Sequence, residues 1–210
     1  MPYLLSILEM ILSCGAVLLA AMLSPEPRME KKNMIWVLLG AAVLGALCGY
    51  VLPLRVKVWQ DMIRISVIIA VFAAVSYCDL HRGKIPNLYP VILVCAMVIC
   101  TLIDLLLGEA DTWSVFIGGL ISGGVMFLLL IICRLLSKGG IGFGDIKLLT
   151  AVGLMLGLQG SFGVLLFGQL SAVLCAVVLM VMKKVTVKDS LPFGPFFYIG
   201  FTVTLLLGIF

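Results

Sequence analysis

Apolar residues fill most of the chain in long runs, and the charged residues gather in the short segments between those runs. A helix needs about 20 residues to cross the hydrocarbon core of a bilayer. The runs predict eight membrane-spanning segments, at residues 3–23, 35–54, 62–79, 88–107, 114–136, 146–158, 162–182 and 194–210. The sixth segment is short for a full crossing, so seven is the alternative count. A half-span is tolerated where the surrounding protein covers its backbone.

The composition supports a membrane protein and excludes an ordinary soluble domain. Of the 210 residues, 63% are hydrophobic and 11% are charged, whereas soluble domains are about half apolar. The excess apolar surface must face lipid, and we therefore predict an all-α, polytopic helical bundle that forms a single integral membrane domain over residues 1–210. Residues 1–23 lack a basic amino-terminal region and contain Glu9, so we expect an uncleaved first span.

The positively charged residues predict the orientation of the bundle. Eleven of the 14 Lys and Arg residues lie in or beside the connections after the first, third, fifth and seventh predicted spans, namely Arg28, Lys31, Lys32, Arg82, Lys84, Arg134, Lys138, Lys147, Lys183, Lys184 and Lys188. These connections all face the cytoplasm if both termini lie outside. Arg55, Lys57 and Arg64 fall on the other side and oppose this orientation. The net charge of +4 thus reflects topology, and we expect no nucleic-acid partner.

Metal and redox chemistry find little support in the sequence. The seven cysteines form no C-x-x-C pair, and the chain has a single histidine, His81. This pattern does not favour a zinc site or a thioredoxin-like pair. We expect the cysteines to be buried apolar thiols.

Three polar or irregular segments on the predicted cytoplasmic side are not explained by lipid contact. They read YCDLHRGKIPN at 77–87, GGIGFGDIKLL at 139–149 and LPFGPFF at 191–197. In the first, Asp79 closes the third span, Pro86 sets a turn and the Asn87 side chain is expected to cap the fourth span. The simpler alternative is that Asp79 only faces interfacial water or pairs with Arg82.

The other two segments combine glycine or proline with a helix start. No G-x-x-x-x-G-K-[ST] pattern is present, so the glycines before Asp145 do not favour a phosphate loop. Glycine allows a sharp bend and a close backbone approach, and Asp145 is expected as the cap or first residue of the next helix. In the third segment, Pro192 and Pro195 bracket Gly194 and should prevent regular helix before about Phe196. An ordinary helix entry and a wall for a docked peptide both stay open.

Asp79 and Asp145 are expected to meet at one membrane face. Two neighbouring carboxyl groups share a proton and titrate as a pair. One can then activate water while the other protonates a scissile carbonyl. Because the helix dipole favours an anion at a helix N-terminus, we expect Asp145 to carry the charge and Asp79 to hold the proton.

Together the three segments resemble the motifs of type IV prepilin peptidases, the membrane aspartic proteases that trim pilin-like precursors. The match comprises D-x₅-IPN from Asp79 to Asn87, GxGDxKL from Gly142 to Leu148, and PFGPF from Pro192 to Phe196. The resemblance implies that Asp79 and Asp145 are catalytic and that no cofactor is needed. It implies site-shaping roles for Ile85, Pro86, Asn87, Gly142, Gly144, Lys147, Pro192, Phe193, Gly194 and Pro195.

The same resemblance implies a substrate and a cellular location. Members of this family cut pilin-like precursors after a short basic leader that usually ends in glycine, at the cytoplasmic face of a prokaryotic plasma membrane. Bifunctional members carry a large insert after the first span that is associated with N-methylation. Here that connection runs only from Ser24 to Met34 and contains no cysteine. We therefore expect a peptidase without the methyltransferase domain, acting on Flp-type, pseudopilin or competence precursors.

Two other classes of protein stay open at this point. Presenilin-like intramembrane proteases share GxGD, but they typically show Tyr-Asp at the first aspartate, whereas this chain has Tyr77-Cys78-Asp79 followed by IPN. A proton-coupled transporter could use membrane carboxylates as relay groups. Such a transporter should show repeats between its halves, and the chain has no second copy of IPN or GFGD.

Overall fold

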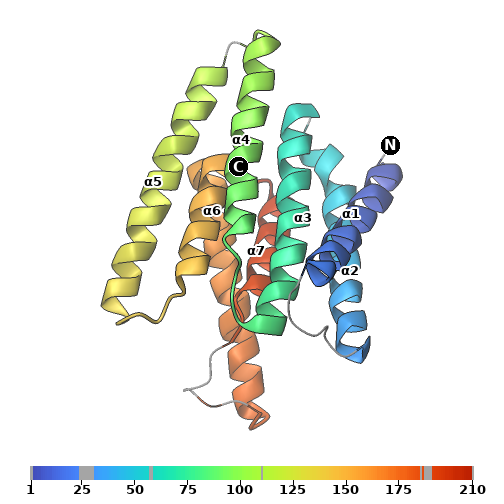
Figure 1. Cartoon of the computed structure of the whole chain (residues 1–210), viewed down its shortest axis with the longest axis vertical. Helices are drawn as coiled ribbons and strands as arrows, with labels where there is room; N and C mark the ends of the chain where they lie inside the picture. The colour runs from blue at the N-terminus through green and yellow to red at the C-terminus, as the bar shows by residue number, and fades with distance from the viewer. Residues whose placement is uncertain are drawn as a thin grey trace.

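The computed structural model describes residues 2–23, 31–56, 59–109, 111–184, 186 and 191–209. These residues form helices and connecting turns without a strand (Figure 1). The helices are α1 (Pro2–Met22), α2 (Lys31–Arg55), α3 (Trp59–Arg82), α4 (Leu88–Leu106), α5 (Thr112–Leu136), α6 (Phe143–Val181) and α7 (Gly194–Leu207). Within the described part, six helices are long and apolar enough to cross a membrane, and α7 is a shorter apolar helix. The predicted multi-pass helical bundle is confirmed.

Helix α6 reverses direction at Gly157, where φ is 70° and ψ is −175°. This backbone conformation is readily available only to glycine. Residues 143–156 rise from the lower end of the bundle in Figure 1, and residues 158–181 descend to it. The two segments correspond to the predicted sixth and seventh spans. At about 1.5 Å per residue the first is about 21 Å long, too short for a full crossing.

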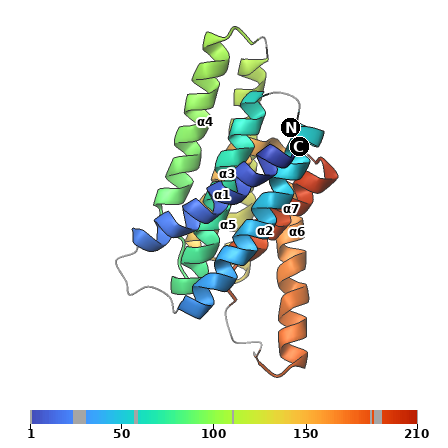
Figure 2. The ribbon, with the colours of Figure 1, turned by 90° about the vertical axis from the view of Figure 1, so that its right-hand side faces the viewer.

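Helix α3 is the centre of the bundle, and two-thirds of its span is buried. Phe72 lies in its middle and stacks against Tyr198 and Phe201 of α7 at ring-centroid distances of 6.4 and 5.6 Å. Figure 2 shows α1 crossing α2 and α3 obliquely on one side. Close packing of α1 on α2 depends on Gly49, because a Cβ there would lie 2.6 Å from the carbonyl oxygen of Leu5.

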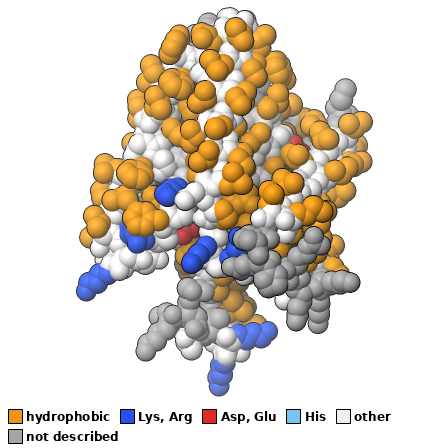
Figure 3. Space-filling view, in the orientation of Figure 1, with side chains coloured by type: hydrophobic (Ala, Val, Ile, Leu, Met, Phe, Trp, Pro, Cys, Tyr) orange, Lys and Arg blue, Asp and Glu red, His pale blue; other side chains and the backbone are white. Residues whose placement is uncertain are grey.

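The two ends of the bundle differ in charge and in the loops they carry. We call the lower end in Figure 1 the Asp79 end and the opposite end the Arg64 end. Figure 3 shows Lys and Arg gathered toward the lower end, with hydrophobic side chains over most of the remaining face. Both termini lie in the upper half of the molecule in Figures 1 and 2. Arg28, Lys57 and Lys188, which entered the orientation argument, lie outside the described residues.

Candidate active site

Asp79 is a buried residue of α3. The helix continues to Arg82, so Asp79 does not close it as the sequence suggested. The backbone N–H of Gly194, the first residue of α7, donates a hydrogen bond of 2.7 Å to Asp79 Oδ2. A Cβ at position 194 would lie 3.0 Å from the Asp79 Cβ and 3.2 Å from the carbonyl oxygen of Val75. Glycine therefore lets the start of α7 approach the carboxylate closely.

Asp145 is the third residue of α6 and is half-buried. The expectation that it would be the cap or first residue was wrong, because Gly142 occupies the N-cap position. The Asp145 carboxylate instead accepts a hydrogen bond from the backbone N–H of Gly142, as the acidic residue of a capping box does. A Cβ on Gly142 would lie 2.8 Å from Asp145 Oδ2, so a side chain there would displace the carboxylate.

The IPN segment packs directly on the start of α6. A Cβ at Gly144 would lie 3.0 Å from the Cβ of Ile85, which leaves room for a hydrogen atom only. Lys147 Nζ donates a hydrogen bond of 3.0 Å to Asn87 Oδ1. The predicted capping of α4 by the Asn87 side chain was wrong: Asn87 has φ −62° and ψ −16° and makes no side-chain cap bond. A residue whose side chain caps a helix usually has an extended backbone. Asn87 has a helical backbone instead, and its side-chain oxygen accepts the hydrogen bond from Lys147.

The start of α7 also differs from the expectation. The helix begins at Gly194, two residues before Phe196, and Pro195 lies in its first turn. Proline is tolerated there because the first turn needs no backbone donor. The N-terminus of α7 therefore points at Asp79, as the N-terminus of α6 carries Asp145. Since a helix N-terminus serves each carboxylate, helix dipoles give no basis for assigning the shared proton to Asp79.

Sequence reasoning overlooked Arg134 as a residue that positions the site. Its guanidinium donates a hydrogen bond to the carbonyl oxygen of Ile141 and lies 4.1 Å from the ring centroid of Phe143. Both contacts hold the loop that leads into α6. The available signal was a cation in the last turn of α5, seven residues before Ile141.

Asp79 and Asp145 line one cavity of about 390 Å³ at the Asp79 end. Its other lining residues are Leu80, Gly83, Gly140, Gly142, Leu191, Pro192 and Phe193. Of the predicted site-shaping residues, Gly142, Pro192 and Phe193 therefore reach the cavity directly. Gly194 contacts Asp79 but does not line the cavity. The remaining six lie nearby but are not among the lining residues: Ile85, Pro86, Asn87, Gly144, Lys147 and Pro195.

Four lining residues were not predicted individually: Leu80, Gly83, Gly140 and Leu191. All four lie inside or beside the three polar segments. Proximity in sequence to a motif was therefore the signal that could have identified them.

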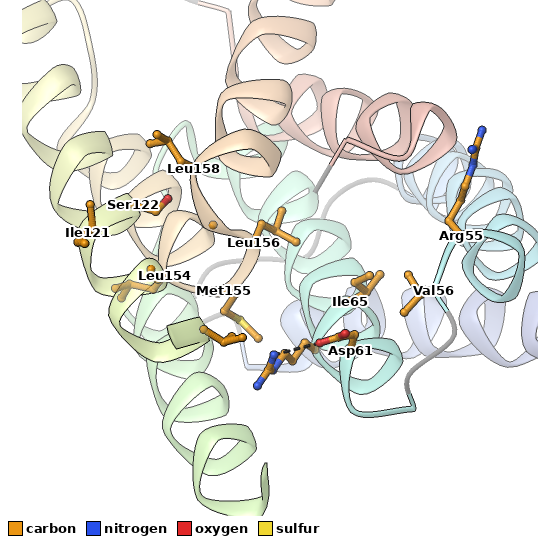
Figure 4. A pocket seen from close by; sticks show the side chains of 15 residues that line it. Arg55, Val56, Asp61, Ile65, Ile121, Ser122, Leu154, Met155, Leu156 and Leu158 are labelled. Atoms are coloured by element: carbon orange, nitrogen blue, oxygen red, sulfur yellow. Dashed lines mark hydrogen bonds and ion pairs between the residues drawn. The ribbon is translucent and has the colours of Figure 1, made fainter. Parts of the chain in front are cut away.

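A second, larger hollow of about 630 Å³ lies at the Arg64 end (Figure 4). It is lined by residues 154–158 around the α6 reversal and by Arg55, Asp61 and Arg64, among others. Arg64 forms ion pairs with Asp61, at 3.0 Å, and with Asp104. A guanidinium thus binds the carboxylates at this end. By contrast, Asp79 and Asp145 accept hydrogen bonds from backbone N–H groups.

Comparison with known proteins connects this arrangement to one family. The model of the type IV leader peptidase family matches residues 66–181, which include both aspartates of the cavity. A protein of Bacillus subtilis (strain 168) named prepilin leader peptidase/N-methyltransferase is 26% identical over 167 residues, covering 80% of this chain and 63% of the relative. A protein of the same name from Aeromonas salmonicida (strain A449) is 30% identical over 139 residues, covering 66% of this chain and 47% of the relative.

A third relative of that name, from Burkholderia pseudomallei (strain 1026b), is 29% identical over 141 residues. That alignment covers 66% of this chain and 44% of the relative. The chain therefore spans less than two-thirds of the length of each of these relatives. No solved structure matches the chain.

Proposed function

Because the chain belongs to the type IV leader peptidase family, we propose that it is a membrane aspartic endopeptidase that removes the short leader from pilin-like precursors. The observation that carries this proposal is the cavity lined by both Asp79 and Asp145. These residues come from different helices, 66 positions apart in the sequence. Two carboxylates that converge in one cavity can supply both the general acid and the general base for hydrolysis of a peptide bond.

In the proposed reaction, the ionised member of the Asp79–Asp145 pair accepts a proton from water as the water oxygen attacks the scissile carbonyl. The protonated member donates its proton to the carbonyl oxygen. The tetrahedral adduct then collapses, the C–N bond breaks, and the departing amine takes a proton from the pair. The products are a leader that ends in a carboxylate and a shortened protein with a free N-terminal amine.

The neighbouring segments support the reaction by fixing both carboxylates. Backbone N–H groups of Gly142 and Gly194 hold Asp145 and Asp79 respectively. Pro192 and Phe193 form part of the cavity wall, where they can contact the peptide on either side of the cut. The reaction needs no metal ion or other cofactor.

We place the cavity at the cytoplasmic face of a prokaryotic plasma membrane, because most of the basic residues lie at the Asp79 end. The whole chain then acts as one peptidase domain. N-methyltransferase activity is not expected, since only residues 23–30 separate α1 from α2.

The proposal is tested with the protein purified in detergent and a prepilin of Bacillus subtilis as substrate, with the Bacillus subtilis relative as positive control. Mass spectrometry should find the precursor shortened by its leader. Asp79→Ala and Asp145→Ala should each abolish the product while circular dichroism shows unchanged helix content. Full cleavage by either variant would show that the two-carboxylate mechanism is wrong.

A further inference from the structure

A shallow apolar groove lies on the outside of α3 between α2 and α7. We call it the α2/α7 groove. It has a volume of about 270 Å³, and small side chains form much of its surface: Gly40 and Ala41 on α2, Ala73 and Ser76 on α3. The Ser76 hydroxyl donates to the carbonyl oxygen of Phe72 in its own helix. The groove therefore offers apolar surface and needs no polar partner.

The α2/α7 groove adjoins the cavity that holds the two aspartates. Leu80 lines both the groove and the cavity. Pro195 also lines the groove, and it follows Gly194, whose N–H binds Asp79. Two other hollows, one among α1, α3 and α4 and one among α4, α5 and α6, share no lining residue with the cavity.

The dimensions of the groove suit one face of a helix. From Ala73 to Leu80, α3 advances about 10 Å, or two helical turns. A volume of about 270 Å³ accepts side chains from one face of a second helix rather than the whole helix. Small residues on both walls allow a partner backbone to approach closely, as in other helix pairs within membranes.

We infer that the α2/α7 groove binds the first two turns of the apolar segment that follows the scissile bond of the precursor. This inference rests on the proposed function. The family resemblance implies that an apolar segment follows the cut in the precursor, and the groove is the apolar surface next to the cavity that could receive it. The shared residue Leu80 is the place where that segment enters the cavity and becomes extended for the cut.

The site also provides a substitution that fills the groove without disturbing the fold. A Cβ built on Gly40 meets no atom within 4 Å, so Gly40→Leu should fold normally and occupy the groove. Gly124 on α5 is equally open and lies outside the groove, so Gly124→Leu is the matched control. We expect Gly40→Leu to slow cleavage of a full-length Bacillus subtilis prepilin at least tenfold, and Gly124→Leu to leave the rate within twofold of wild type.

A second substrate separates docking from chemistry. A soluble peptide that contains the leader and only four residues beyond the cut has no apolar segment to dock. Gly40→Leu and wild type should therefore cleave it at equal rates. An equal slowing of both substrates by Gly40→Leu, or no slowing of either, overturns the inference.

Photo-crosslinking reads docking without requiring cleavage. A prepilin with a photo-reactive residue at the fourth or seventh position after the cut is bound to the purified protein and irradiated. Crosslinks at Trp36, Ala41 or Ser76 support the inference, whereas crosslinks confined to α4 and α5 overturn it. If wild type cleaves no precursor yet crosslinks in the groove, the proposed function fails while the docking site stands.

Discussion

At the Arg64 end of the bundle two aspartates bind one guanidinium, whereas at the Asp79 end two aspartates bind backbone N–H groups. Asp61 and Asp104 flank Arg64. Asp79 and Asp145 accept hydrogen bonds from Gly194 and Gly142. Asp61 borders the hollow at the Arg64 end, and both Asp79 and Asp145 border the cavity at the Asp79 end. The first pair joins the consecutive helices α3 and α4, whereas the second joins α3 and α6.

The two pairs differ in the partner that holds the carboxylates: a charged guanidinium at one end and uncharged backbone N–H groups at the other. A fixed guanidinium stabilises both charges and holds α3 to α4, so the Arg64 end serves the fold. Backbone N–H groups orient a carboxylate without adding a permanent cation, which is what the proposed proton transfers of Asp79 and Asp145 require. Under the proposed function, the partner of each carboxylate separates the two pairs: a cation at the Arg64 end and backbone N–H groups at the Asp79 end.

The largest effect is expected when the amide replaces the acid at the Asp79 end. Asp79→Asn and Asp145→Asn keep the side-chain shape but remove the exchangeable proton, and each should lower prepilin cleavage by a factor of about 10² to 10⁴. Asp61→Asn at the Arg64 end should leave the cleavage rate within threefold of wild type. Comparable losses in all three variants would contradict the division between the two ends.

The next effect is expected on stability rather than on cleavage. Arg64→Ala leaves the buried Asp104 without its guanidinium, and breaking such a pair costs about 3–5 kcal/mol. The thermal unfolding midpoint in detergent should fall clearly, while the folded variant still cleaves the precursor. Arg55→Ala is the control, because Arg55 is exposed and makes a hydrogen bond to the Leu206 carbonyl oxygen. Loss of cleavage without loss of stability would make Arg64 part of the reaction.

A smaller effect should follow from adding one methyl group beside Asp145. Gly142 has φ −67° and ψ 142°, which alanine adopts without strain. Its Cβ would nevertheless lie 2.8 Å from Asp145 Oδ2, so Gly142→Ala should slow cleavage about tenfold with little change in unfolding temperature. Gly118→Ala at the Arg64 end is the matched control, since its Cβ meets nothing within 4 Å. Equal rates in the two variants would show that the Asp145 carboxylate tolerates displacement.

The smallest effect concerns the exposed hydrogen bond between Lys147 and Asn87. A single exposed hydrogen bond contributes about 0.5–1.5 kcal/mol, so Lys147→Ala and Asn87→Ala should each reduce cleavage only a few-fold. The double variant should be no slower than the single variants, because the two side chains act through one contact. Additive losses would mean that each residue contacts the substrate separately.

The sequence predicted the helices well because bilayer thickness sets the length of most apolar runs. It also predicted that Asp79 and Asp145 lie at one end of the bundle, because the charges and the order of the spans together determine which connections share a face. The contacts at the Arg64 end could not be predicted from the sequence. The pairing of Arg64 with Asp104 joins residues 40 positions apart, and no local pattern announces it.

Details inside the motifs also depended on distant contacts. The Asn87 side chain was expected to cap α4, but it accepts a hydrogen bond from Lys147, 60 positions away. Arg134 was counted only as a positive charge, although it holds the loop that precedes Asp145. The sequence predicted separate spans at 146–158 and 162–182, but Gly157 is one of 22 glycines, and no local pattern identified it as the residue that reverses α6.

The reversal at Gly157 also determines on which side of the membrane the chain leaves α6. A straight helix over the 39 residues of α6 would be about 58 Å long, nearly twice the hydrocarbon thickness of a bilayer. The chain would then leave α6 on the far side of the membrane, and Gly194 would emerge opposite Asp79. By turning back, one glycine returns the chain to the side from which it entered. A single backbone angle thus determines whether the third motif can meet the first two at all.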